Sequence, residues 1–421
     1  MADILIIGAG LAGAAAALGL TDRGHRVTVV EARGRVGGRA DSRDWAGGVV
    51  EYGGGWLRAD HGRMIALAAR LGVGLMPRVA LSGRRWFAGG RALAAPSAEM
   101  AAHRAGMERL KGDAALLAAG GAEAAHLSGM TAAAYLDHRD LPDSVRREFL
   151  SWWAISGSGD PGRIGVTELL TPKLAQGMEV KLEELALTVE GGVSRLVAGA
   201  LGASGAEVLT GDAVERVEVA GDGVRAVLSG GRACRAEAAV VAVPVNGLAQ
   251  MRFDPPLAGA PGALRAAGHI GRAVKVLIRA RGVEPGVLAT GETAGLRWFW
   301  ADHLLPDGTV LVVGFGLFDE MGAPSAEGVA AAMAAAFPGA TVQGYDWHDW
   351  VSDPFARGTW VSPALETVGL YDPGEWAGHP RLAFAGSDHA SAEQGWFEGA
   401  LLTAEAAVAR LDREWTKGVR V

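Results

Sequence analysis

Several features that would assign a protein to common functional classes are missing from this chain of 421 residues. Its one cysteine, Cys234, excludes an internal disulfide and a multi-cysteine metal centre, and no metal site is expected. The formal net charge of -7 argues against a nucleic-acid partner. No apolar run is long enough to cross a bilayer, and residues 1–3 lack the basic residues that open a signal peptide. We therefore expect a cytoplasmic protein without a membrane partner.

Tyrosine is also scarce, since the chain has 4 tyrosines against 13 tryptophans. Three pairs of tryptophans are close in the sequence: Trp152 and Trp153, Trp298 and Trp300, and Trp347 and Trp350. Tryptophan is a large core residue, so packing accounts for many of them. The functional alternative is a cavity with aromatic walls.

The N-terminal residues have the pattern of a dinucleotide-binding site. The apolar run Ile4–Ile7 predicts a buried parallel strand, and the alanine-rich stretch Leu11–Leu20 predicts a helix. Gly8 allows a tight turn, Gly10 lets a pyrophosphate approach the backbone, and Gly13 lets the helix pack closely on the strand. The N-terminus of the helix offers unpaired amides to the phosphates.

An acidic residue and a second glycine-rich segment extend this pattern. Arg26–Val30 predicts the next strand, and Glu31 at its end would accept hydrogen bonds from ribose hydroxyls. An ordinary βαβ unit explains the first glycines but not Glu31 followed by Gly37–Arg39, an extension that an NAD enzyme does not need. A further glycine-containing block stands near the C-terminus, at Leu382–Ala400. Together, the two blocks indicate a flavin.

Because the two blocks lie at opposite ends of the chain, the domain that binds the nucleotide should be discontinuous. Residues 76–189 have a largely helical pattern, whereas strands are predicted within 207–243 and at 274–278 and 309–313. We expect an α/β fold in which an α+β substrate-binding domain is inserted into a Rossmann-like FAD-binding domain. The expected FAD-binding domain comprises residues 1–75, 190–264 and 353–421, and the substrate-binding domain comprises residues 76–189 and 265–352.

The ordered set of motifs resembles the flavin-containing amine oxidase family, which includes monoamine oxidases, polyamine oxidases and L-amino-acid oxidases. The resemblance covers nearly the whole chain. It is carried by Gly8–Gly13 with Glu31, Gly37–Arg39, Gly53–Trp56, Glu190–Gly192, Val241–Pro244, Asp353–Trp360 and Leu382–Ala400. It implies that a small apolar or aromatic amine is oxidised to an imine, which is hydrolysed to a carbonyl compound, while oxygen is reduced to hydrogen peroxide. It is also compatible with a homodimer.

The resemblance implies which residues contact FAD. Glu31 would hold the adenosine ribose, Arg33 and Arg39 would serve the phosphates and the ribityl region, and the backbone of Val214 would meet the adenine. Ser387 and Asp388 replace the threonine and glutamate that are more common in the C-terminal motif, and they keep the hydroxyl and the carboxylate. The implied FAD-binding residues are Gly8, Gly10, Leu11, Ala12, Gly13, Glu31, Ala32, Arg33, Gly38, Arg39, Gly53, Gly54, Gly55, Trp56, Val214, Trp350, Gly386, Ser387, Asp388, Gly395, Trp396, Phe397 and Ala400.

Three residues are predicted to act on the substrate. Trp360 and Trp396 occupy the two positions of the family's aromatic cage, whose rings flank the path to the flavin, although both could be core residues. Lys275 lies in the apolar run Ala273–Leu277, where an unpartnered ammonium would be costly. The resemblance implies that it holds a water against the reactive flavin nitrogen. The alternative is an outward-facing lysine on an edge strand.

The cofactor is expected to be bound without a covalent bond, because Thr359 stands where some family members carry a flavin-linked cysteine. Arg58, Arg163 and Arg297 are candidates to bind a substrate carboxylate, as an L-amino-acid oxidase would require. The flavin motifs also fit two different functions: a flavin desaturase or dehydrogenase of a lipid or secondary metabolite, and a flavin-bound protein without turnover.

Overall fold

The predicted βαβ unit is present at the N-terminus of the computed structural model, which describes residues 2–88, 91–93, 97–171, 182–221, 223–291, 295–371, 376 and 380–416. β1 (Asp3–Ile7) and β2 (Arg26–Glu31) are parallel, and α1 (Leu11–Thr21) connects them. Gly8 has a φ of +106°, which favours glycine at the turn into α1. A Cβ atom on Gly13 would lie 2.0 Å from the carbonyl oxygen of Gly8, so helix and strand could not pack this closely with any other residue there.

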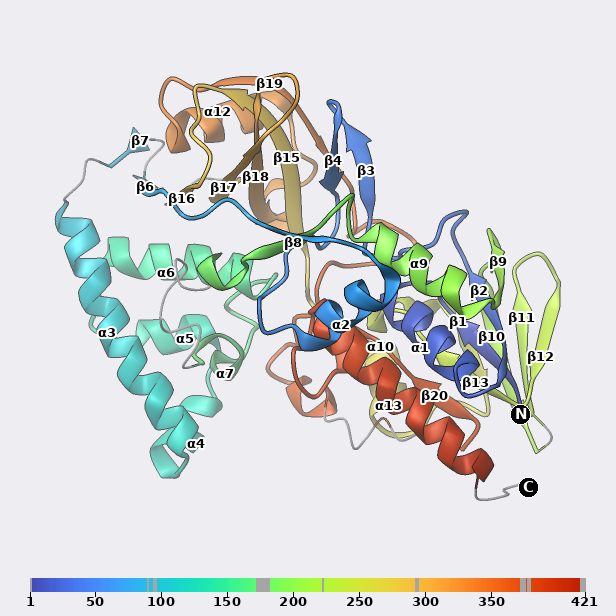
Figure 1. The fold of residues 1–421 in the computed structure, drawn as a ribbon. Helices are drawn as coiled ribbons and strands as arrows, with labels where there is room; N and C mark the ends of the chain where they lie inside the picture. The colour runs from blue at the N-terminus through green and yellow to red at the C-terminus, as the bar shows by residue number, and fades with distance from the viewer. Residues whose placement is uncertain are drawn as a thin grey trace.

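This unit belongs to a five-stranded parallel sheet whose strand order is β20-β13-β1-β2-β9. The other three strands are β9 (Glu207–Thr210), β13 (Ala238–Val241) and β20 (Leu382–Phe384). α1 packs against α9 (Ser194–Ser204) and α13 (Phe397–Thr416), and the three helices lie side by side (Figure 1). A four-stranded sheet contributes to the core on the opposite face: β10 (Val214–Ala220), β11 (Gly223–Leu228), β12 (Ala233–Ala236) and β14 (Arg252–Asp254).

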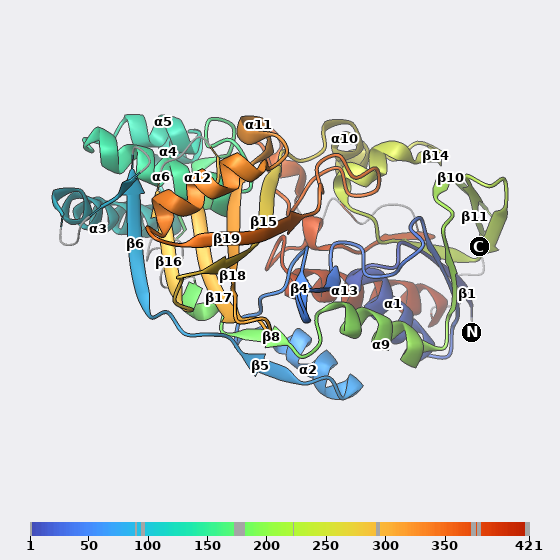
Figure 2. The ribbon, with the colours of Figure 1, turned by 90° about the horizontal axis from the view of Figure 1, so that it is seen from above.

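A seven-stranded sheet with the order β19-β15-β18-β17-β16-β6-β7 forms the other half of the molecule (Figure 2). Its strands are β6 (Gly83–Ala88), β7 (Arg91–Ala92), β15 (Ala273–Arg281), β16 (Val287–Gly291), β17 (Trp298–Leu304), β18 (Val310–Leu317) and β19 (Thr341–Trp347). Every residue of β18 is buried, because α12 (Ala326–Ala336) packs on the face that holds Val312 while α6 (Asp143–Ser156) packs on the face that holds Val313.

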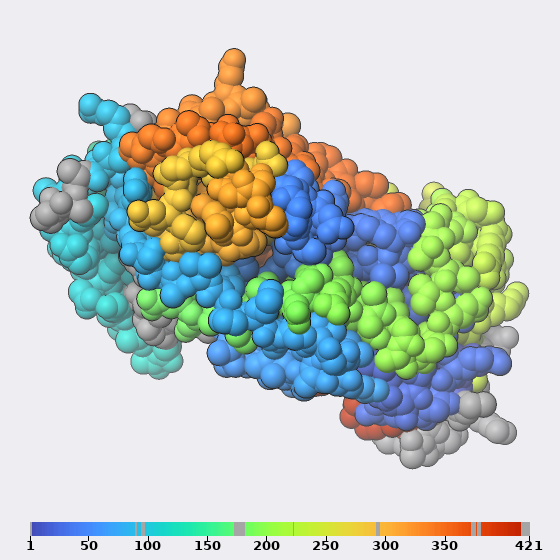
Figure 3. Space-filling model, turned by 45° about the horizontal axis from the view of Figure 1, so that its top comes forward, coloured from blue at the N-terminus to red at the C-terminus, as the bar shows by residue number. Residues whose placement is uncertain are grey.

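The remaining described elements flank or connect these layers. They are β3 (Ser42–Trp45), β4 (Gly48–Glu51), α2 (Gly62–Leu71), β5 (Leu75–Pro77), α3 (Ala98–Ala119), α4 (Ala122–Ser128), α5 (Ala132–Asp137), α7 (Val166–Leu169), β8 (Leu187–Val189), η2 (Val245–Gln250), α10 (Gly259–Ala267), α11 (Phe318–Met321), η3 (Val368–Tyr371) and η5 (Ser387–His389). The space-filling view shows early residues, in blue, packed directly against the yellow and orange residues of the seven-stranded sheet (Figure 3). Among the described helices, none is long and apolar enough to cross a membrane.

The expected α/β architecture with a Rossmann-like parallel sheet is confirmed. The described part of segment 76–189 is largely helical, as expected, and it also contains the short strands β6, β7 and β8 and most of β5. β6 lies beside β16 in parallel register, with Trp86 opposite Thr290 and Phe87 opposite Gly291. The pairing joins residues about 200 positions apart, so local sequence periodicity gives no sign of it.

Candidate active site

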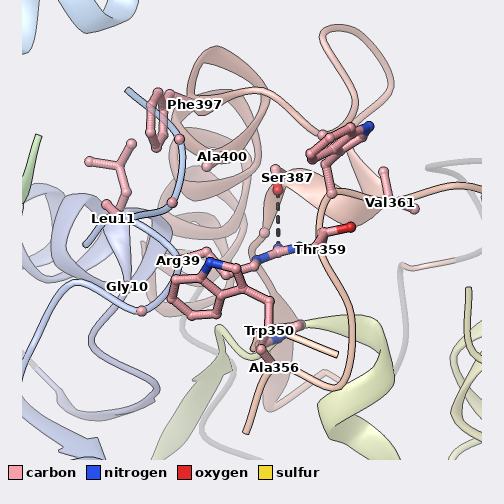
Figure 4. A pocket seen from close by; sticks show the side chains of 18 of the residues that line it. Gly10, Leu11, Arg39, Trp350, Ala356, Thr359, Val361, Ser387, Phe397 and Ala400 are labelled. Carbon is pink, nitrogen blue, oxygen red and sulfur yellow. Dashed lines mark hydrogen bonds between the residues drawn. The ribbon is translucent and has the colours of Figure 1, made fainter. Parts of the chain in front are cut away.

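A cavity of about 870 Å³ is lined by residues from both large sheets. Ile7 and Val30 contribute from the parallel sheet, and Trp298 and Phe315 contribute from the seven-stranded sheet. All the residues predicted from the sequence to bind FAD or to act on the substrate line this cavity, except Gly13 and Asp388. Segments that are hundreds of residues apart therefore meet at one place, and Figure 4 shows part of that wall.

Glu31 is held rigidly at the end of β2. The residue is 4% exposed, and its two carboxylate oxygens accept hydrogen bonds from the backbone N–H groups of Ala9 (2.8 Å) and Arg33 (2.9 Å). The guanidinium of Arg33 pairs in turn with Asp353 and lies 5.3 Å from the ring centre of Phe355. A carboxylate fixed in this way, beside the N-terminus of α1, suits the ribose end of a dinucleotide.

The glycines at this end of the cavity leave space for a ligand. A Cβ atom on Gly10 would meet only the carbonyl oxygen of Gly37, at 3.9 Å, so the backbone there is open. Gly10 is the N-cap residue of α1, and it makes no side-chain hydrogen bond to the first turn of the helix. An open backbone and a helix N-terminus without a side-chain cap fit the pyrophosphate of FAD.

A second glycine segment passes close to two other parts of the wall. A Cβ atom on Gly53 would lie 1.8 Å from the carbonyl oxygen of Arg39, and one on Gly54 would lie 2.7 Å from Cζ of Phe397. The indole N–H of Trp350 donates to the carbonyl oxygen of Tyr52, 3.0 Å away, and so packs against the same segment. Only glycine allows the chain to pass between Arg39 and Phe397 here.

Arg39 connects the N-terminal and C-terminal blocks. It donates hydrogen bonds to the carbonyl oxygen of Thr359 (2.6 Å), to Oγ of Ser387 (3.3 Å, dashed in Figure 4) and to Oδ1 of Asp388 (2.6 Å). Asp388 is 1% exposed, and its other oxygen accepts from the backbone N–H of Val245. Burial is the largest single effect and opposes its ionisation, but Arg39, His269 and the backbone N–H of Val245 together lower the pKa of Asp388 to about 2. Asp388 thus reaches the cavity through Arg39, and direct contact with the cofactor is not supported.

Lys275 lies in the interior of the seven-stranded sheet, because β15 is hydrogen-bonded to β19 on one side and β18 on the other. The edge-strand alternative is therefore wrong. Its Nζ donates to the carbonyl oxygens of Glu51 (2.6 Å) and Gly53 (2.9 Å) and lies 5.8 Å from the ring centre of Trp56. Burial lowers the pKa of Lys275 to about 8, against the opposing effects of Glu51 and Asp302. Lys275 thus lines the cavity, and its ammonium group is more acidic than that of an ordinary lysine.

A row of aromatic side chains extends along the wall beyond Lys275. The ring centre of Trp298 lies 6.0 Å from that of Trp56 and 5.2 Å from that of Phe315, which lies 6.0 Å from that of Trp360. All four line the cavity. Trp298 and Phe315 were not predicted as site residues. They are directly opposite each other on β17 and β18, and only the strand register brings them together.

Trp396 lines the cavity just before the start of α13. Its ring meets that of His61 edge to face, with centres 5.7 Å apart and an angle of 62° between the planes. The structure thus brings both predicted cage residues, Trp360 and Trp396, to one cavity. His61 does not line the cavity and supports the ring of Trp396 from outside.

The position before Trp360 offers no thiol. The hydroxyl of Thr359 is hydrogen-bonded to Oγ of Ser158 (2.6 Å) and accepts from the backbone N–H of Ala273 (3.1 Å). Cys234 lies in β12, away from the cavity lining.

The three arginines considered for a substrate carboxylate are already paired. Arg58 lines the cavity, but its guanidinium binds Asp60 and Glu393. Arg297 pairs with Glu320, and Arg163, which lies 3.8 Å from Glu366, is more than half exposed. Neither Arg297 nor Arg163 lines the cavity. This arrangement does not favour an L-amino-acid oxidase.

Known proteins resemble the chain over nearly its whole length. Residues 11–412 match the model of the family described as flavin-containing amine oxidoreductase. The chain is 32% identical to (S)-6-hydroxynicotine oxidase of Paenarthrobacter nicotinovorans, over 97% of this chain and 99% of that protein. The structure resembles those of putrescine oxidase bound to putrescine (TM-score 0.83, 22% identity, 98% and 99% covered) and cyclohexylamine oxidase of Brevibacterium oxydans (0.83, 22%, 99% and 99%). The chain therefore belongs to the flavin-containing amine oxidoreductase family, as its motifs predicted, and it is an FAD-dependent amine oxidase.

Proposed function

We propose that the substrate is a small amine with an apolar or aromatic body, and that oxygen accepts the electrons. The amine and oxygen give an imine and hydrogen peroxide, and water then converts the imine to a carbonyl compound and ammonia or a smaller amine. The observation that carries this proposal is the row of rings formed by Trp56, Trp298, Phe315 and Trp360. The names of two similar proteins, a hydroxynicotine oxidase and a cyclohexylamine oxidase, refer to amines that carry a ring.

We propose that the FAD-binding residues inferred from the sequence hold the cofactor, with Gly13 and Asp388 acting through Gly8 and Arg39. Glu31 binds the ribose, the amides at the start of α1 bind the pyrophosphate, and the Gly53–Gly55 segment lies against the flavin ring. Bound FAD supplies the acceptor for the two electrons and the hydrogen that leave the amine. The domain boundaries expected from the sequence form part of the proposal.

The side chains of this protein contribute orientation and exclusion of water. Trp360 and Trp396 limit the amine to one approach, with its α-carbon toward the flavin. The aromatic wall removes water from the reacting carbon and nitrogen. Lys275 holds its ammonium on the carbonyl oxygens of Glu51 and Gly53, where it can orient a water at the edge of the cavity. Only a neutral amine has its lone pair free, so the rate should rise with pH until the bound amine is deprotonated.

A panel of amines tests the proposal through the release of hydrogen peroxide under air. Cyclohexylamine, benzylamine, a pyrrolidine, putrescine and L-phenylalanine would be compared. We expect peroxide with the ring-bearing amines that have no carboxylate and little with L-phenylalanine. Peroxide with L-phenylalanine alone would contradict the proposed substrate class.

Two tryptophan variants link this activity to the cavity. Trp360→Ala removes a cavity ring, and Trp45→Ala is the matched control, because Trp45 lies in the β3–β4 hairpin and does not line the cavity. We expect a large loss of peroxide release only for Trp360→Ala, with FAD content unchanged in both.

A further inference from the structure

A paired set of charges links two distant parts of the cavity wall beside Trp396. Arg58 and Glu393 are 335 residues apart, and Nη1 and Nη2 of the arginine donate to the two carboxylate oxygens at 2.8 and 2.6 Å. The arginine side chain is 10% exposed and the glutamate side chain 29%. The other edge of the same guanidinium binds Asp60 at 2.7 and 3.0 Å. Two bidentate pairs leave Arg58 little freedom to move.

Glu393 begins the tight turn that leads to Trp396. Its φ is +56°, in the left-handed region that is unfavourable for a residue with a side chain of this length. Its carbonyl oxygen accepts a hydrogen bond from the backbone N–H of Trp396 at 3.0 Å. A Cβ atom on Gly399 would lie 2.2 Å from the same oxygen, so α13 packs tightly on the turn. A strained residue in such a turn needs its surroundings to hold it, and Arg58 holds its carboxylate.

His61 completes the set. It is fully buried, its Nδ1 accepts from the backbone N–H of Arg58 at 3.3 Å, and its Nε2 lies 3.9 Å from the carboxylate of Glu393. Burial and the charge of Arg58 lower the pKa of His61, which favours the neutral ring. Its edge-to-face contact with Trp396 therefore rests on packing.

We infer that Arg58, Glu393 and His61 form a brace that sets the position of the Trp396 ring in the active site. The three are positioning residues, and the inference rests on the proposed role of Trp396 in orienting the amine. Arg58 and Glu393 fix the position of the turn before Trp396, and His61 fixes the orientation of the Trp396 ring. A shift of about 1 Å in a group that orients substrate can cost on the order of a hundredfold in rate. The brace therefore controls which amines fit between Trp396 and Trp360.

Glu393→Ala tests the brace, with Asp60→Asn as its matched control. Glu393→Ala removes the carboxylate that accepts hydrogen bonds from Nη1 and Nη2 of Arg58. Asp60→Asn changes the second partner of the same guanidinium, whose side chain is 65% exposed. We expect kcat/KM for a ring-bearing amine to fall by about tenfold or more in Glu393→Ala. We expect less than about a twofold change in Asp60→Asn. Glu393→Gln should recover only part of the loss, because its single amide oxygen can accept one of the two hydrogen bonds from Arg58.

A double-mutant cycle separates a positioning role from a general loss of stability. In a Trp396→Ala background, the same change at Glu393 should alter kcat/KM by less than about twofold, because the ring that it positions is gone. Binding of a non-reacting amine, measured through the flavin absorbance, should weaken in parallel with kcat/KM. FAD content should stay constant. If Glu393→Ala does not fold, Arg58→Lys replaces it, since lysine keeps the charge but loses the fork.

Multiplicative effects of the two mutations, or an unchanged kcat/KM in both Glu393→Ala and Arg58→Lys, would overturn the brace. If Trp396→Ala itself has no effect, the proposed role of Trp396 fails, and the brace fails with it. A loss in Trp396→Ala without any loss in Glu393→Ala and Arg58→Lys overturns the brace alone.

Discussion

Replacing Lys275 with methionine should change how the stability of the enzyme depends on pH. Methionine keeps the length of the side chain and removes the ammonium that donates to Glu51 and Gly53. Burial is the main cause that lowers the pKa of Lys275 to about 8 from its ordinary value of 10.5. Each pKa unit corresponds to about 1.4 kcal/mol. Keeping this group charged in the folded protein therefore costs at most about 3.5 kcal/mol relative to the unfolded chain.

The sign of the effect follows from the protons bound by each state. Between pH 8 and 10.5 the unfolded chain keeps the lysine proton and the folded chain has lost it. The wild type should therefore gain free energy of unfolding as pH rises through this window, relative to Lys275→Met. Titrating groups that do not interact with Lys275 behave alike in both proteins, so they cancel in the difference, and the carboxyl group of Glu51, which does interact with it, titrates outside this alkaline window.

Urea unfolding of both holoenzymes at pH 7, 8, 9 and 10 measures this difference. We expect it to move by about 1 kcal/mol or more in favour of the wild type from pH 8 to 10. A difference that stays constant within about 0.5 kcal/mol would mean that the lysine has an ordinary pKa and is well solvated. The same variant should retain FAD and oxidise amines, or be reoxidised by oxygen, more slowly.

Three further expectations concern the cofactor and the surroundings of the lysine. Gly13→Ala places a Cβ atom 2.0 Å from a carbonyl oxygen, so it should destabilise the protein by about 1–3 kcal/mol and cause loss of FAD. Gly62→Ala is the control, because a Cβ atom there meets nothing within 4 Å, and it should leave stability and FAD content unchanged. Thermal unfolding and an FAD assay compare the two variants. Acid precipitation should leave free FAD in the supernatant, and flavin that stays with the precipitated chain would contradict a dissociable cofactor. Arg78→Met removes a buried guanidinium that lies 4.1 Å over Trp56 and helps to lower the pKa of Lys275, so the pH window of the urea experiment should move upward.

Local sequence was sufficient for the nucleotide end of the site. The spacing of Gly8, Gly10 and Gly13 before Glu31 requires a strand, a turn and a helix in that order, and the structure contains them. Lys275 was recognisable because a lysine within a buried apolar strand needs a partner. Its hydrogen-bond partners are backbone carbonyl oxygens, and these could not be predicted from the pattern of side chains in the sequence.

The substrate end was less accessible to sequence reasoning, because it depends on contacts between distant segments. Trp298 and Phe315 face each other only through the register of β17 and β18. The pair formed by Arg58 and Glu393 spans 335 residues. Asp388 was predicted to bind the cofactor, and the structure shows its side chain buried, hydrogen-bonded to Arg39 and outside the cavity lining.

Anaerobic mixing of the FAD-loaded enzyme with a ring-bearing amine tests the central claim most directly. The loss of flavin absorbance reports amine oxidation without any contribution from oxygen. We expect rapid bleaching in the wild type, bleaching slower by on the order of a hundredfold in Trp396→Ala at equal FAD content, and a smaller loss with altered amine preference in Trp396→Tyr. Equal bleaching rates in the wild type and in both Trp396→Ala and Trp360→Ala would contradict the account of this cavity as the place where amines are oriented and oxidised.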